Sequence, residues 1–491
     1  MQCSTLPRVL GVLLLLAGLA GCAGFTPPTA PVPLVIDDVT VVDAVNGVRE
    51  RQQVHVVGDS IVYVGPADAA ADPEASAAAG LPPGARRIDG RGRTLIPGLW
   101  DMHVHLTFEP AITEAMRTLF LAHGITSVRD TGGPLDTLVA LRADYESGRR
   151  PAPRLYFSGP LLDGRFVVYD GGDPGRPPIG TRVATPEAAT RWVETLKASG
   201  ADFIKIYELV DPVVFDALVA AAEANDLPIA AHVPLALSAV EAGPKLDSLE
   251  HVRNLEIACA ANAEELLRDR LATLAGYRGE RGYLLRKSIH EAQRLPAIAA
   301  YDSAHCKQVA EAMADTVQVP TLRLNAFAVA RPFERPDWEP ALARVTPSEL
   351  RDAWAADAAS RRAAEHGDPT FGDWSMGLVG ILHGAGVPIG AGTDTPITLS
   401  IPGYSLHTEL ELLVRSGLSP LEALEAATLV PARFFSLEDE IGTIEVGRRA
   451  DLVLLRANPL DDIRNTREIE AVVSRGVLYS PDELAPALLA D

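Results

Sequence analysis

The sequence predicts an α/β protein in which a (β/α)8 TIM barrel is accompanied by a small β-sandwich. Two observations carry this prediction. From Leu99 onward, short apolar runs alternate with amphipathic helical stretches, the pattern of repeated βα units around a parallel sheet. Residues 34–98 and the tail from residue 436 show instead the period-two alternation of β-strands.

The first 21 residues are typical of an export signal. An apolar run from Val9 to Ala20 is shorter than a membrane-spanning helix needs. The sequence LAGC at 19–22 resembles the lipobox of bacterial lipoproteins, in which the cysteine is acylated. This resemblance implies lipidation at Cys22, a Pro-rich tether over residues 22–33, and a lipid-anchored protein of the bacterial cell envelope that faces the periplasm or the exterior. An ordinary signal peptide is the alternative.

The net charge of −21 argues against a nucleic-acid partner, because phosphate contact requires a basic face. Hydrophobic residues make up 47% of the chain, so it can bury a large core. Four cysteines are too few for a disulfide scaffold. Export would nevertheless permit Cys259 and Cys306 to form a disulfide, and two isolated buried thiols are the alternative.

The barrel is expected over residues 99–435, where eight short apolar runs are predicted strands. They are residues 98–101, 127–130, 154–158, 203–207, 228–232, 248–251, 317–322 and 387–391. Residues 34–98 and 436–482 are predicted to form the two parts of one sandwich beside the barrel. A separate C-terminal β module is the alternative.

Two intervals, 258–316 and 325–384, are longer than a barrel needs and have a helical pattern. The second contains TPSEL at 346–350, a helix start with Pro at the first position. Because loops after strands lie at the catalytic mouth, both insertions are candidate lids. Packing against the barrel flank, or against a partner subunit in a homo-oligomer, is the alternative.

Two histidines follow the first predicted strand in PGLWDMHVHL. Period-two geometry points the imidazoles of His103 and His105 in the same direction, toward a shared point. Imidazole is a preferred ligand of Zn, so the pair indicates a metal site.

Lys205 lies between Ile204 and Ile206 in a predicted buried strand, where a bare ammonium is costly. It is one of only five lysines among 44 basic residues, so Arg supplies most of the positive charge elsewhere. A primary amine with a lowered pKa can react with carbon dioxide to give a carbamate, an anionic ligand able to bridge two metals. A snorkelling or paired lysine is the alternative.

Three more candidate ligands lie at predicted strand ends: His232 in PIAAHVP, His251 in DSLEHV and Asp394 in VPIGAGTDTP. Alone, each is explained as a structural histidine or a turn aspartate. With the three residues above they occupy the carboxyl ends of the first, fourth, fifth, sixth and eighth strands, where a barrel brings its functional groups together. Of the other histidines, we expect His55 at the surface and His290 on a solvated helix, whereas His123 and His407 are candidates for contacts near the mouth.

The order His-x-His, Lys, His, His, Asp resembles the amidohydrolase superfamily, and the flanking sequence is similar to its imidazolonepropionase-like branch. The motifs that carry the resemblance are IPGLWDMHVH, TSVRDTGG, FIKIY, AAHVP, SLEH, IGAGTD, HTELELLVRSGLSPLEALEAAT and GTIEVGRRADLVLL. The resemblance implies a distorted barrel, a sandwich built from both chain ends and a centre of two divalent metal ions, expected to be Zn. By the family pattern one ion is held by His103, His105 and Asp394, the other by His232 and His251, with carbamylated Lys205 between them.

The same resemblance implies hydrolysis of an amide, peptide-like or cyclic amide C–N bond in a small molecule by a metal-activated hydroxide. Asp394 would be the catalytic residue that accepts the proton and delivers it to the departing nitrogen. Tyr207, Arg165 and Tyr169 are candidate contacts for a substrate carboxylate. Packing at the barrel mouth is the alternative for the two tyrosines.

Three competing functions remain. Mononuclear deaminases on this fold typically lack the bridging lysine and carry Glu three residues after the fifth-strand histidine, where this chain has Leu235. A lactone or other ester hydrolase is an alternative because the same hydroxide attacks esters. The third is an inactive, surface-tethered binding protein.

Overall fold

The computed structural model describes residues 32–68, 84–481 and 483–484. The export signal over residues 1–21, the lipidation site Cys22 and all but the last two residues of the tether lie outside the described residues. Within the described part of the chain, no helix combines the length and the apolar character that crossing a membrane requires.

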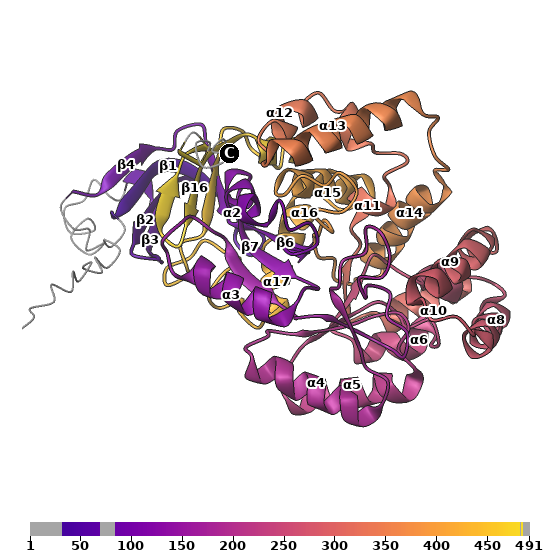
Figure 1. The fold of residues 1–491 in the computed structure, drawn as a ribbon. Coiled ribbons are helices and arrows are strands. Elements are labelled where there is room, and N and C mark those ends of the chain that lie inside the picture. The colour runs from indigo at the N-terminus through magenta and orange to yellow at the C-terminus, as the bar shows by residue number, and fades with distance from the viewer. Residues whose placement is uncertain (1–31, 69–83, 482, 485–491) are drawn as a thin grey trace, which may run out of the picture. The chain divides into compact units, whose positions relative to one another are not determined.

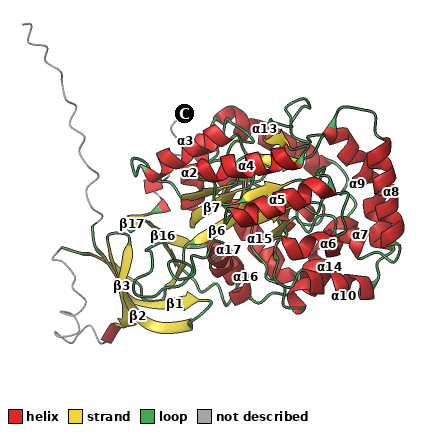
Figure 2. Ribbon diagram, turned by 90° about the horizontal axis from the view of Figure 1, so that it is seen from below, coloured by secondary structure: helices red, strands yellow, loops and turns green. Residues whose placement is uncertain are grey.

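Both ends of the described chain contribute to one eight-stranded sheet, in the order β17-β16-β15-β5-β1-β2-β3, with β4 paired to β1. Figure 2 shows β1, β2 and β3 near β16 and β17. The strands are β1 (Leu34–Asp43), β2 (Gly47–Val57), β3 (Ser60–Pro66), β4 (Arg86–Asp89), β5 (Thr94–Pro97), β15 (Leu452–Leu455), β16 (Ile469–Ser474) and β17 (Val477–Tyr479). The junction is antiparallel, with Leu95 of β5 opposite Leu454 of β15. Both residues lie in a separate hydrophobic cluster of this sheet.

Parallel strands form two further sheets. The first has the order β6-β7-β8 and the second the order β10-β9-β11-β12-β13-β14. The strands are β6 (Leu99–Val104), β7 (Ile125–Asp130), β8 (Arg154–Phe157), β9 (Leu161–Asp163), β10 (Gly180–Arg182), β11 (Ile204–Ile206), β12 (Ile229–Ala231), β13 (Ser248–Glu250) and β14 (Val317–Val319). Seven of the eight predicted strands are therefore present, and β9 and β10 were not predicted.

The eighth predicted strand, residues 387–391, does not form a strand, and this prediction was wrong. The longer segment 387–395, which extends past the predicted strand, makes only two isolated parallel bridges, Gln318 to Ile389 and Val104 to Thr395. Pro388 has no N–H to donate to a ladder, and Asp394 has a φ of 59°, outside the extended region. These bridges nevertheless connect the segment to β14 on one side and β6 on the other.

Helices alternate with the parallel strands. They are α2 (Thr113–Ala122), α3 (Leu135–Glu146), α4 (Pro186–Ala198), α5 (Pro212–Ala224), α6 (Ala239–Ala242), α7 (Leu255–Ala258), α11 (Leu322–Asn325), α15 (Tyr404–Arg415), α16 (Pro420–Ala426) and α17 (Leu429–Phe434). Local sequence explains where they begin. Thr185 caps α4 by accepting a hydrogen bond from the Ala188 N–H, and Ser419 and Glu422 form a capping box at α16. Figure 1 shows α4 and α5 side by side.

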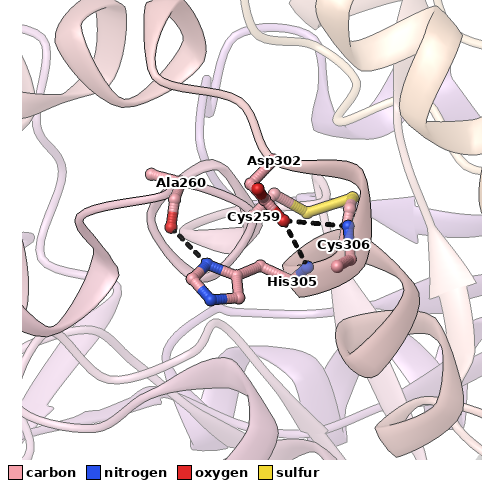
Figure 3. Close-up of a disulfide and its surroundings, with 6 residues drawn as sticks. Cys259, Ala260, Asp302, His305 and Cys306 are labelled. Carbon is pink, nitrogen blue, oxygen red and sulfur yellow. Dashed lines mark hydrogen bonds between the residues drawn. A yellow bond between two sulfur atoms is a disulfide. The ribbon is translucent and has the colours of Figure 1, made fainter.

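The two predicted insertions are helical, as expected. The first contains α8 (Ala263–Gly276), α9 (Gly282–Ala299) and α10 (Ser303–Ala312), and the second α12 (Trp338–Leu342), α13 (Ser348–Ala363) and α14 (Thr370–Gly384). A disulfide joins Cys259, just after α7, to Cys306 in α10 (Figure 3). Beside it, Asp302 caps α10 and the His305 imidazole contacts the Ala260 carbonyl at 2.7 Å. The disulfide thus closes the chain segment that carries α8 and α9.

Candidate metal centre

A cavity of about 220 Å³ lies at the carboxyl ends of the parallel strands and is lined by all six predicted ligands. These residues are His103, His105, Lys205, His232, His251 and Asp394. His103 belongs to β6 and Lys205 to β11, whereas His232 and His251 directly follow β12 and β13. The structure therefore brings together residues that are separated by up to 291 positions in the sequence.

Three of the six form a compact group. The Asp394 Oδ1 atom lies 3.3 Å from Nε2 of His103 and 3.2 Å from Nε2 of His105. All three side chains are buried, and their ligand atoms lie within 4.8 Å of one another, close enough to share one metal ion.

The other two histidines extend this cluster. The ring centroid of His251 lies 4.5 Å from that of His103 and 4.8 Å from that of His232. Burial lowers the pKa of His232 and of His251 well below the usual value, so both imidazoles are neutral at neutral pH. Neutral imidazole is the form of histidine that ligates metals.

Each of the four imidazoles is held through its Nδ1 atom. The partners are Glu250 for His103 at 2.5 Å, the Gly132 carbonyl for His105 at 3.0 Å, Glu208 for His232 at 2.8 Å, and Thr321 for His251 at 2.6 Å. Because a carbonyl oxygen and an ionised carboxylate can only accept, Nδ1 carries the proton in His103, His105 and His232. In a neutral imidazole so held, Nε2 is the atom without a proton, which is the form that metal ligation requires.

Among the six predicted ligands, two buried polar atoms have no hydrogen-bond partner within the described chain: Lys205 Nζ and Asp394 Oδ1. Such an atom typically costs about 1–3 kcal/mol, so its presence requires an explanation. Burial lowers the pKa of Lys205 to about 7, which makes the amine available in its neutral, nucleophilic form. A cation beside Asp394, and conversion of Lys205 to an anionic ligand, would satisfy both atoms. The residues present therefore fit a metal centre.

Asp394 is fixed by its backbone and by Asp101. The Asp394 N–H donates to the His103 carbonyl at 2.7 Å. The buried Asp101 carboxylate accepts from the Thr393 hydroxyl at 2.6 Å and from the His103 N–H at 3.2 Å. Asp101 therefore ties the segment of Asp394 to the strand of His103. Burial raises the pKa of Asp394, but contacts with His103 and His105 outweigh burial and hold it well below its usual value.

Two of the three residues predicted as substrate contacts lie at the cavity, and the third does not. Tyr207 and Tyr169 line the cavity, and the Tyr207 ring lies 4.6 Å from the His232 ring. Arg165, by contrast, is exposed, does not line this cavity, and stacks over Phe166 instead. The reason is local: Asp163 accepts backbone N–H groups from Gly164 and Val168 and folds this loop so that Arg165 points outward.

Three arginines that sequence reasoning missed line the cavity instead: Arg176, Arg253 and Arg286. Arg286 forms an ion pair with Glu208 at 2.8 Å. Neither Arg176 nor Arg253 has a carboxylate within 4.0 Å among the residues that the structure describes. Arg253 follows His251 by two positions, which was the only sequence signal for any of the three.

Two of the remaining histidines were expected to be exposed to solvent, and both expectations were wrong. His55 is buried and stacks on Tyr63, and His290 is buried against Glu208 rather than solvated. His123 and His407 contact each other, with His407 Nε2 3.0 Å from the His123 carbonyl, and neither lines the cavity.

Comparison with known proteins gives a family match over part of the chain. Residues 371–478 match the Amidohydrolase family, a stretch that includes Asp394 but not the other five residues. Ochratoxinase of Aspergillus niger is 40% identical over 90 residues, which cover 18% of this chain and 18% of that protein. Imidazolonepropionase of Thermoplasma acidophilum is 36% identical over 101 residues, covering 19% of this chain and 24% of that protein. The chain thus matches less than a quarter of the length of either relative.

The fold comparison extends over nearly the whole chain. The solved structure of bottromycin amidohydrolase has a TM-score of 0.65 and 23% identity, and the match covers 94% of this chain and 91% of that one. Residues 371–478 therefore match the Amidohydrolase family, and the chain shares the fold of the bottromycin amidohydrolase structure.

Proposed function

We propose that this chain is a metal-dependent hydrolase that cleaves an amide C–N bond in a small peptide-like or cyclic substrate. The observation that carries the proposal is the buried cluster in which four imidazoles, each held through Nδ1, share one cavity with Lys205 and Asp394. The family match of residues 371–478 and the shared fold support it.

In this proposal His103, His105 and Asp394 would hold one ion, His232 and His251 would hold a second, and Lys205, as its carbamate, would supply an anionic ligand. Zn is the expected metal because imidazole is one of its preferred ligands. Two such ions would supply Lewis acidity toward the scissile carbonyl and lower the pKa of a water molecule. The unpartnered Lys205 amine favours this two-metal centre over a mononuclear deaminase.

Asp394 transfers the proton from the attacking water to the departing nitrogen. Its carboxylate is ionised, so it can take a proton from the attacking water. The same carboxyl group then donates the proton to the departing nitrogen. The hydrogen bond from the Asp394 N–H to the His103 carbonyl keeps the carboxylate in place between the two steps.

We propose that Arg176 and Arg253 bind a carboxylate of the substrate. Both guanidinium groups line the cavity, and neither has an acidic partner within the described chain. Arg253 Nε is in addition buried without a hydrogen-bond partner there. An N-acyl amino acid or a dipeptide would place its carboxylate on these cations and its amide at the six-residue cluster.

We further propose that the two parallel sheets and residues 389–395 together form one distorted barrel, because this segment bridges to both β14 and β6.

We also propose that the protein is anchored in the cell envelope through Cys22. The Cys259–Cys306 disulfide supports export, since disulfides persist mainly in oxidising compartments. Metabolic labelling with a radioactive fatty acid should mark the intact chain and fail to mark Cys22→Ser.

The proposed activity is tested by metal analysis of the purified full chain together with a substrate panel of N-acyl amino acids, dipeptides, cyclic amides and lactones. We expect close to two zinc ions per chain, turnover of at least one amide, loss of turnover after chelation and recovery when zinc is returned. A chain that binds no divalent metal, or an amidase activity that survives complete chelation, would contradict the proposal.

A further inference from the structure

Glu208 is a fully buried carboxylate that joins the candidate metal centre to the first insertion. It accepts from Nδ1 of His232 at 2.8 Å, from Nε of Arg286 at 2.9 Å and from Nε2 of His290 at 2.5 Å. His232 follows β12, whereas Arg286 and His290 belong to α9. One carboxylate therefore contacts a candidate ligand on one side and the insertion on the other.

The protons in this network are determined by its chemistry. Arg294 Nη2 lies 3.2 Å from His290 Nδ1, and a guanidinium can only donate, so His290 Nδ1 is an acceptor. The His290 proton is therefore on Nε2, which donates to Glu208. Glu208 therefore lies between two donors of α9, Arg286 and His290, and accepts from both. Its contact with Nδ1 of His232 leaves the Nε2 atom of that imidazole for a metal.

Helix α9 packs against residues that line the cavity. Leu285 and Ile289 are buried in the same hydrophobic cluster as Tyr169 and Tyr207, which line the cavity. The Cys259–Cys306 disulfide closes the segment from which α9 comes. The first insertion was predicted as a lid or a flank element, but its helix α9 packs directly against the site.

The other three histidines are held differently. His103 donates to Glu250, which is in β13. His105 donates to the carbonyl of Gly132, which lies just after β7. Glu250 also accepts from Arg129 of β7 at 2.6 Å. Thr321, which contacts His251, follows β14. These partners all belong to the parallel strands or to the residues directly after them, so the insertion supports only one of the four imidazoles through such a contact.

We propose that Glu208 is a positioning residue through which α9 orients His232, so that the metal held by His232 and His251 depends on the first insertion and the metal held by His103, His105 and Asp394 does not. This inference rests on the proposed two-metal function. It predicts that a change in α9, which contains none of the six candidate ligands, weakens one metal selectively.

The test compares metal binding by the unaltered full chain with that by Glu208→Gln and His290→Ala. Gln removes the charge that His232, Arg286 and His290 share, and Ala removes one contact from α9. Zinc affinities are measured by competition with a chromophoric chelator, and cobalt substitution reports each coordination sphere through its visible absorption. We expect one of two ions to bind about 10- to 100-fold more weakly in Glu208→Gln, with a smaller loss of the same ion in His290→Ala.

Asp451→Asn is the matched control, because it disrupts another ion pair, that of Asp451, just before β15, with Arg154 of β8 at 2.8 Å, and neither residue lines the cavity. It should lower the melting temperature without changing either metal affinity. Equal weakening of both ions in Glu208→Gln would show a merely structural role and overturn the proposal. Two ions bound as tightly in Glu208→Gln as in the unaltered chain would also overturn it, whereas fewer than two ions in the unaltered chain would refute the two-metal function itself.

Discussion

The Nε2 atom of His103 and the Oδ1 atom of Asp394 lie 3.3 Å apart, although the two residues are separated by 291 positions in the sequence. Oδ1 is buried and accepts no hydrogen bond within the described chain, so it is available to a cation, and the carboxylate is also the proposed proton acceptor. Both properties belong to one side chain, and this makes Asp394 the most informative residue to change.

Asp394→Asn should reduce kcat by about 100- to 10,000-fold, the usual contribution of a general base, because an amide oxygen cannot take the proton. The fold should persist, since the backbone N–H of residue 394 still reaches the His103 carbonyl. The measurement is kcat on the best amide of the panel, with circular dichroism and metal content recorded alongside. An Asn variant with kcat within a factor of three of the unaltered enzyme would exclude Asp394 as the base.

Replacement of Lys205 separates the two-metal centre from a one-metal centre. Lys205→Ala removes the only primary amine of the cavity lining, so metal content should fall from about two ions toward one. Short carboxylic acids should restore part of the content by taking the place of the carbamate. Lys205→Arg should not recover the second ion, because a guanidinium forms no carbamate. A single metal ion per chain that Lys205→Ala leaves unaffected would favour the mononuclear deaminase.

The pH dependence of stability in the metal-free protein gives an independent check on Lys205. Burial lowers the pKa of its amine to about 7 from 10.5, so between these values the unfolded chain binds more protons than the folded chain. Stability from this group should therefore rise as the pH increases from 7 toward 10.5, and the penalty should be fully present below pH 7. Urea unfolding of the unaltered chain and of Lys205→Met across this range measures the difference, and parallel curves would show that the amine titrates normally.

Much of the site could be predicted because its residues lie at the ends of short, continuous patterns. Apolar runs identified seven strands, and a residue at the carboxyl end of a parallel strand must face the same edge as its neighbours. His232 and His251 were placed in this way. The eighth run could not be placed as a strand, since Pro388 and the left-handed Asp394 interrupt the ladder without disturbing the hydrophobic pattern.

Other parts of the site depend on packing that no local pattern encodes. Glu208 lies two residues beyond the end of β11, where strand alternation no longer indicates its direction. Arg286 and His290 lie on the polar face of α9, which the sequence indicates to be exposed to solvent. In the structure α9 packs so that both residues contact Glu208 instead. Arg176 lies in a Gly- and Pro-rich loop that has no period at all.

The last prediction concerns the arginine that binds the substrate carboxylate, for which the sequence indicated Arg165 and the cavity indicates Arg253. Arg253 lines the cavity and has no acidic partner within 4.0 Å in the described chain, whereas Arg165 is exposed and stacks on Phe166. Arg253→Met should raise KM for an N-acyl amino acid by about 10- to 100-fold, as expected for a charge-assisted hydrogen bond worth about 1.5–3 kcal/mol.

Two controls make this comparison specific. Arg165→Met removes an arginine of the same size from outside the cavity and should leave KM unchanged. An N-acyl amino acid amide, which lacks the carboxylate, should show no difference between Arg253→Met and the unaltered enzyme, because no ion pair is lost. If Arg253→Met raised KM equally for the acid and its amide, the arginine would act by shaping the cavity rather than by binding the carboxylate. A rise in KM with Arg165→Met alone would instead return the carboxylate contact to the loop where the sequence first placed it.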